Sequence, residues 1–153
     1  MVGRMSIKIK MESNPNAWWI YALLSALFAA LTTILAKAGI EGVSANLATA
    51  IRTFVILIVT WGIVWIEGSV QNLQQIPYKS ILLLIFSGIS TGLSWLFYFR
   101  ALQLGKASLV SPIDKSSVVI VLLLSAIFLG ESLSWQSILG TFLVLSGILV
   151  LIL

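Results

Sequence analysis

The sequence predicts an all-α integral membrane protein with five transmembrane helices. Three observations predict the five-helix membrane fold: the composition, the length of the apolar runs and the brevity of their connections. Of 153 residues, 59% are hydrophobic and only 9% are charged. A soluble domain carries roughly a quarter charged residues, and one core could not bury so much apolar surface.

Five apolar runs approach the roughly 20 residues that a helix needs to cross a bilayer core. We expect spans at residues 17–36, 45–66, 81–102, 109–129 and 135–153. The connections "QLGKAS" and "GESLS" are so short that neighbouring spans must run antiparallel. Two regions follow: a polar, basic tail over residues 1–16 and one five-span domain over residues 17–153.

The first span has a competing interpretation as a signal peptide. Basic residues precede it, and small residues at 36 and 38 resemble a cleavage site. However, the run from 18 to 35 exceeds the roughly 7–15 apolar residues of a signal sequence, and hydroxyl side chains are spread along it. We therefore expect this segment to remain as a membrane span.

Two residue classes support five spans rather than four. With alternating directions, aromatic residues fall at the span ends on the N-terminal side of the membrane, as an interfacial belt requires. These residues are Trp18, Trp19, Trp65, Tyr78 and Trp135. Charged residues fall in the opposite half. They are Lys37, Arg52, Arg100, Lys106, Asp114 and Lys115.

Composition also limits the chemistry of the chain. It has no cysteine and no histidine, which excludes disulfides and thiolate or imidazole metal sites. We expect no metal, no cofactor and no catalytic residue, so the chain is not predicted to be an enzyme. The net charge of +4 is spread over single basic residues, and no nucleic-acid partner is expected. A structural or assembly subunit of a membrane complex would explain the spans, but it gives no reason for buried charges.

Arg52 and Asp114 are the charges predicted to lie deepest. Each is about seven residues into its span, or about 10 Å below the surface, and Trp95 reaches the same depth. Asp114 and Lys115 are adjacent and point about 100° apart on a helix, so we expect them to pair poorly. Arg52 is then the predicted partner of Asp114, in a water-accessible cavity shared with Trp95.

Pro112 offers another explanation for Asp114. A proline break would let the helix begin near Asp114, which would then serve as a cap near the headgroups. Both explanations can hold together, because broken helices commonly line transporter sites. Separately, the pairs Gly88–Gly92 and Gly140–Gly147 are expected to let helices pack closely within the chain, and a dimer face is the alternative for either pair.

The segments "FYFRALQLGKASLVSPI" and "FLGESLSWQSILGTFLVLSGILVL" carry a family resemblance. The alanine-leucine-x-x-glycine step, the small residues before the proline and the leucine-glycine-glutamate turn at 129–131 match in order and spacing. They resemble the EamA-type domain of the drug/metabolite transporter superfamily, with coverage from about residue 18 to residue 153.

The resemblance implies a transporter of small metabolites, with efflux expected and a substrate cavity between spans one to four. Members usually carry two such domains as inverted repeats. By this resemblance the chain is half of an inverted-repeat transporter, and it is expected to pair with a second unit, as an antiparallel homodimer or with another five-span chain. The bilayer would be a cell membrane, expected to be a bacterial inner membrane.

Within this picture, five residues are candidates for binding the substrate or a coupling ion. They are Arg52, Trp95, Tyr98, Asp114 and Lys115. Arg52 matches an arginine common in the second span of this domain, whereas Asp114 and Lys115 match no motif. Asp114 is a hypothetical proton or counter-ion site, and the two aromatic residues offer stacking surfaces. The excess of positive charge in this half favours zwitterionic or anionic metabolites over organic cations.

Overall fold

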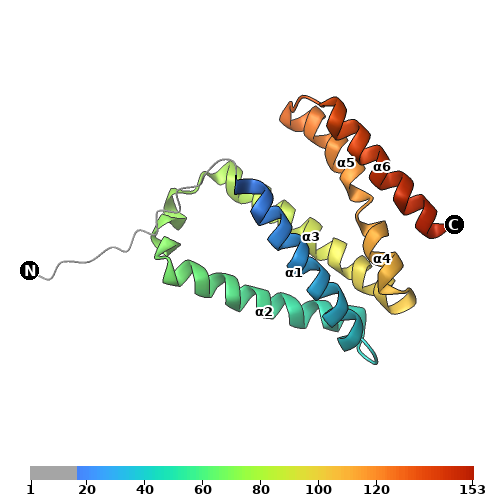
Figure 1. The fold of residues 1–153 in the computed structure, drawn as a ribbon. Helices are drawn as coiled ribbons and strands as arrows, with labels where there is room; N and C mark the ends of the chain where they lie inside the picture. Colours follow the sequence, from blue (N-terminus) through green and yellow to red (C-terminus); the bar gives the residue numbers. More distant parts are fainter. Residues whose placement is uncertain (1–16) are drawn as a thin grey trace, which may run out of the picture. The chain divides into compact units, whose positions relative to one another are not determined.

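A computed structural model of the chain describes residues 17–153, and its regular elements are all helical (Figure 1). In chain order they are α1 (Trp18–Gly39), α2 (Ala45–Ile66), η2 (Ser69–Gln75), α3 (Tyr78–Leu104), α4 (Ala107–Asp114), α5 (Ser117–Leu124), η3 (Ser125–Leu129) and α6 (Trp135–Ile152). Five helical segments are long and apolar enough to span a membrane, the fourth being α4, α5 and η3 together. The five-span prediction is confirmed, while the predicted basic tail lies outside the described residues.

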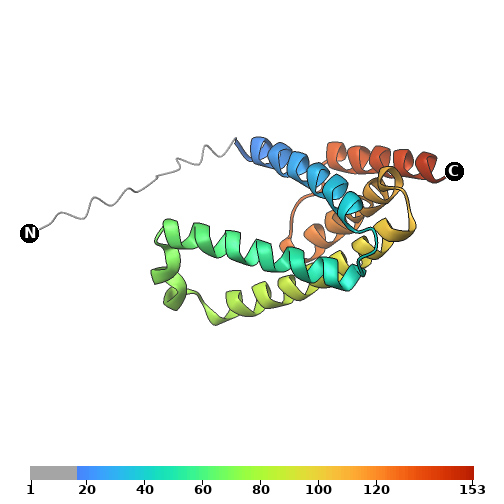
Figure 2. The same ribbon diagram turned by 90° about the horizontal axis from the view of Figure 1, so that it is seen from below.

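Helices α2 and α3 lie side by side and run in opposite directions (Figures 1 and 2). The Ser44 side chain caps the start of α2 by accepting a hydrogen bond of 3.2 Å from the backbone N–H of Leu47. The reversal after α2 uses Gly68 at φ 70°, a left-handed conformation that glycine adopts without strain. Pro77 then precedes α3, where its missing N–H is not needed.

The last turns of α1 are attached to the end of α3 by a lysine. The Lys37 ammonium donates to the carbonyl oxygens of Leu102 and Gly105, the latter at 2.8 Å. These carbonyls lack partners within the helix and carry the negative end of its dipole, so a cation is favourable there. Lys37 therefore caps the end of α3.

A small buried cluster lies beside this contact. Ile40, Ala45 and Phe99 form its centre, and Trp95 and Tyr98 pack against it. Most other apolar side chains of the spans are exposed, as expected of helices whose outer faces meet lipid rather than water. The cluster therefore fixes the packing at one end of the α2–α3 pair.

The fourth span is broken close to its charged residues. Pro112 lies inside α4 and has no N–H to donate, and the chain leaves α-helical bonding just after it. The N–H groups of Lys115 and Ser116 donate to carbonyls three residues back, at 3.0 Å each. The predicted break is therefore present. Its expected consequence is wrong, because Asp114 ends α4 rather than beginning a helix.

Replacing Lys37 tests the cap on α3. Lys37→Met should lower the free energy of unfolding by about 1–2 kcal/mol, because two carbonyls lose a charged donor. Thermal unfolding of the purified protein in lipid nanodiscs measures this. Lys106→Met is the matched control, since Lys106 is exposed and has no side-chain contact in the described part of the chain. Equal melting temperatures for the two variants would contradict the claim that Lys37 stabilises the end of α3.

Candidate functional site

A pocket of about 390 Å³ lies between α2 and α3. From α2 it takes Thr49, Arg52, Thr53 and Ile56. From α3 it takes Leu84, Ser87, Gly88, Thr91, Gly92 and Trp95, with Phe99 at one end. Both sets recur at spacings of three and four residues, so each comes from one face of its helix.

Arg52 is the charged residue of this pocket and lies against an aromatic ring. Its guanidinium carbon is 3.6 Å from the ring centroid of Trp95 and 5.5 Å from that of Phe99. The Nη1 atom is buried and has no hydrogen-bond partner among the described residues. Stacking on an aromatic ring offsets part of the penalty for a cation in a membrane span, but it leaves that N–H group unsatisfied.

Trp95 also contacts a second aromatic ring. Tyr98 meets it edge to face, with centroids 5.6 Å apart and an interplanar angle of 81°. The Tyr98 hydroxyl in turn hydrogen-bonds to the Thr33 Oγ1 at 2.8 Å. A chain of contacts therefore runs from α1 through two aromatic rings to the arginine, and it fixes the ring on which Arg52 lies.

The hydroxyl groups of the pocket wall already donate most of their protons within the helices. Thr49, Thr53 and Thr91 donate their hydroxyl protons to carbonyls four residues back at 2.8–2.9 Å. Their oxygens retain lone pairs and can accept from a ligand. No acidic side chain lines the pocket in the described structure. The wall therefore offers one cation, several acceptors and apolar surface.

The glycines of α3 border open space within residues 33–153. A Cβ atom added at Gly88 or Gly92 would meet nothing within 4 Å in that part of the chain. The same holds for Gly140 and Gly147. Packing of a helix against either pair stays a prediction, and Gly88 and Gly92 line the pocket.

Asp114 and Lys115 form an ion pair with each other at 3.3 Å. The expectation that neighbours would pair poorly assumed a continuous helix, and it is wrong because α4 ends at Asp114. Within residues 17–153, no ion pair joins Asp114 to Arg52. The predicted Arg52–Asp114 pair is therefore also wrong, and Asp114 is 38% exposed in its own pair.

The predicted site residues thus fall into two groups. Arg52 and Trp95 meet in the pocket, as their equal depth predicted, and Tyr98 contacts the tryptophan ring edge to face. Asp114 and Lys115 form a separate pair. Sequence analysis missed the threonines and serine of the wall. The four-residue spacing from Thr49 to Thr53 and from Ser87 to Thr91 would have indicated them.

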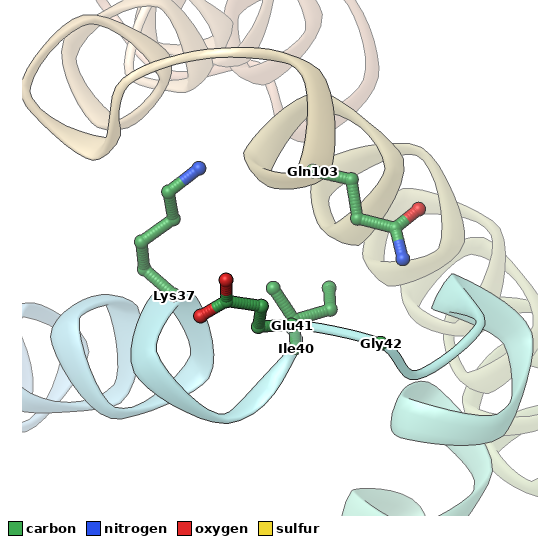
Figure 3. A pocket seen from close by; sticks show the side chains of 5 residues that line it. All are labelled: Lys37, Ile40, Glu41, Gly42 and Gln103. Atoms are coloured by element: carbon green, nitrogen blue, oxygen red, sulfur yellow. The ribbon is translucent and has the colours of Figure 1, made fainter.

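A second pocket, of about 480 Å³, lies at the loop after α1 (Figure 3). In the figure Lys37 reaches upward from α1, Glu41 lies beside it on the loop, and Gln103 projects from α3. The lysine already caps α3, and the Gln103 amide donates to the Val43 carbonyl at 2.7 Å. Because these polar groups are occupied, this pocket is the weaker candidate.

Comparison with known proteins places these features in a family. The EamA-like transporter family model matches residues 16–153. A protein from Sinorhizobium sp., described as an uncharacterized transporter in cobO 3'region, is 47% identical over 136 residues, which is 89% of this chain and 96% of that protein. No solved structure matches the chain.

The absence of a carboxylate beside Arg52 changes what its removal should do. An unpaired cation in a span costs about 2.5–3.5 kcal/mol, whereas a desolvated cation–π contact returns about 2 kcal/mol. Arg52→Met should therefore leave the free energy of unfolding unchanged or raise it by about 1 kcal/mol. Unfolding in nanodiscs measures this, with Trp95→Leu as a variant expected to destabilise. A marked loss of stability for Arg52→Met would show that the arginine has an ionic partner in the folded protein.

Proposed function

This chain belongs to the EamA-like transporter family, and from that membership we propose that it moves small metabolites out of the cell across a bacterial inner membrane. Five membrane-spanning helices make it a multi-pass membrane protein. The observation that carries the proposal is the α2–α3 pocket, where a buried guanidinium nitrogen lacks a partner. Ionisable groups inside spans commonly mark substrate or ion pathways.

The functional unit in this proposal contains two five-span units. The wall of the pocket comes from two helices, and its glycines face open space. The alignment with the Sinorhizobium protein covers 96% of that protein, so the relative too has the length of one unit. An antiparallel homodimer, or a pair with another five-span chain, would supply the opposite wall and allow alternating access.

Proton coupling is the further part of the proposal, and Asp114 is its candidate. In the described part of the chain it is the one carboxylate inside the five spans. It lies beside the break of the fourth span, where backbone irregularity commonly accompanies ion sites in transporters. Lys115 is then the counter-charge beside this candidate, since the two side chains form an ion pair.

The other function classes have less support. A structural subunit explains the spans but not the unsatisfied arginine within them. A membrane enzyme needs a nucleophile or an acid–base pair at the pocket, and the described lining has hydroxyls whose protons are mostly bound to helix carbonyls. Transport needs only a binding site and does not depend on a nucleophile or an acid–base pair.

Transport by two units can be tested by diluting the protein in lipid vesicles. Purified protein is reconstituted at ratios from several copies to less than one copy per vesicle, and uptake of a metabolite panel is measured. Uptake per copy should fall steeply below two copies per vesicle, because a lone unit lacks one wall. Uptake that stays proportional to the amount of protein down to one copy per vesicle would contradict the two-unit proposal. Absence of uptake at many copies per vesicle would contradict the proposed transport.

Asp114→Asn tests the coupling site. We expect gradient-driven transport to fall at least about tenfold, because the amide cannot release a proton, while exchange of labelled for unlabelled substrate without a gradient persists. Glu131→Gln is the control, since Glu131 lies in the loop before α6. Wild-type gradient-driven transport by Asp114→Asn would remove Asp114 from the mechanism.

A further inference from the structure

We propose that the α2–α3 pocket binds a small organic monocarboxylate, with the Arg52 guanidinium holding the carboxylate and the apolar wall holding the body of the molecule. This inference rests on the proposed transport function and names the substrate class of the same pocket. Its support comes from the charge of the lining, the buried guanidinium N–H group that has no partner in the described structure, and the state of the hydroxyl groups.

The charge balance of the pocket selects a monoanion. Arg52 contributes one positive charge, and no acid among the described lining residues offsets it. Electrostatic interactions strengthen as water is excluded, so the site favours a ligand that brings the total charge to zero. An organic cation would place two positive charges in one pocket. A dianion such as a phosphate monoester would leave one negative charge without a partner.

The position of the guanidinium favours a carboxylate among the monoanions. Trp95 covers the face of the group at 3.6 Å, which leaves the N–H groups at its edge for hydrogen bonding. The buried Nη1 lacks a partner in the described structure. A carboxylate matches the planar N–H edge of arginine with two parallel hydrogen bonds, and such charge-assisted pairs are among the strongest in proteins.

The remaining wall defines the body of the ligand. Ile56, Leu84 and Phe99 provide apolar surface beside Trp95, and the volume of about 390 Å³ accommodates a small molecule. The threonine hydroxyls are committed as donors but free as acceptors, so they favour a ligand that carries a hydroxyl or N–H group. Extra phosphate oxygens would find few donors there, which again favours a carboxylate.

The test measures equilibrium binding to the whole protein in lipid nanodiscs with no gradient. Radiolabelled benzoate is the first probe, and hexanoate and pyruvate are tested as competitors. Neutral benzamide, cationic benzylamine and phenyl phosphate are close to benzoate in shape but differ from it in charge or in the type of anion. We expect at least one carboxylate to bind, and these three analogues to compete at least about tenfold more weakly. Benzamide and benzylamine lose the charged hydrogen-bonded pair, and phenyl phosphate brings a second negative charge that has no partner.

Two variants locate the site. Arg52→Gln should abolish carboxylate binding, while Arg100→Gln, which changes an exposed arginine outside this pocket, should leave it unchanged. Gly92→Leu should also abolish binding, because its side chain would enter open space beside the pocket. Gly62→Leu, at an equally open glycine of α2 outside the lining, is its control. Unchanged melting temperatures show that each variant is folded.

The outcomes separate this inference from the proposed function. The inference is wrong if none of the three carboxylates binds, if benzamide, benzylamine or phenyl phosphate competes equally, or if Arg52→Gln binds as the wild type does. Transport of other metabolites together with any of these results would leave the proposed function intact. Carboxylate binding that depends on Arg52, without transport at high protein density, would support the inference and contradict the proposed function.

Discussion

The structure depends on one constraint: a charged arginine lies within an apolar span, and no side chain among residues 17–153 forms an ion pair with it. Arg52 lies on the face of Trp95, and its buried Nη1 has no hydrogen-bond partner in the described residues. A chain that needed only stability would place an apolar side chain here, because an unpaired charge in a span costs about 2.5–3.5 kcal/mol. Retaining the charge indicates a group that joins it only part of the time, and a substrate anion fits that description.

The surrounding fold holds this arrangement in place. Tyr98 braces Trp95, Thr33 hydrogen-bonds to Tyr98, and Lys37 fastens the end of α3 one turn further on. These contacts concentrate at one end of the α2–α3 pair, where the buried cluster lies. Within residues 33–153, a Cβ atom at Gly88 or Gly92 would by comparison meet open space. The well-packed end of the helix pair therefore positions the cation, and the open region leaves space for a ligand or a second unit.

The sequence predicted the number and order of the spans because both follow from the length of apolar runs and of the links between them. It also predicted that Arg52 and Trp95 would meet, since residue counts give depth to within a turn. It failed for Asp114. Depth does not determine which way a side chain points around its helix, and the chain leaves α-helical geometry after Asp114, which lets that residue pair with Lys115. The pocket threonines were missed because no single threonine indicates a site, and only the facing of α2 and α3 brings them into one pocket.

The central claim, that Arg52 has no carboxylate partner until a ligand arrives, can be measured directly. Asp114 is the one aspartate of the sequence, so labelling aspartate carboxyl carbon marks it alone. Arginine guanidinium nitrogen is labelled in protein in which Arg4 and Arg100 are changed to lysine. Solid-state NMR in lipid bilayers then reports dipolar coupling between the two groups. The account predicts no coupling between Arg52 and Asp114, and coupling to the carboxyl carbon of added labelled benzoate. Coupling between Arg52 and Asp114 in the ligand-free protein would contradict it.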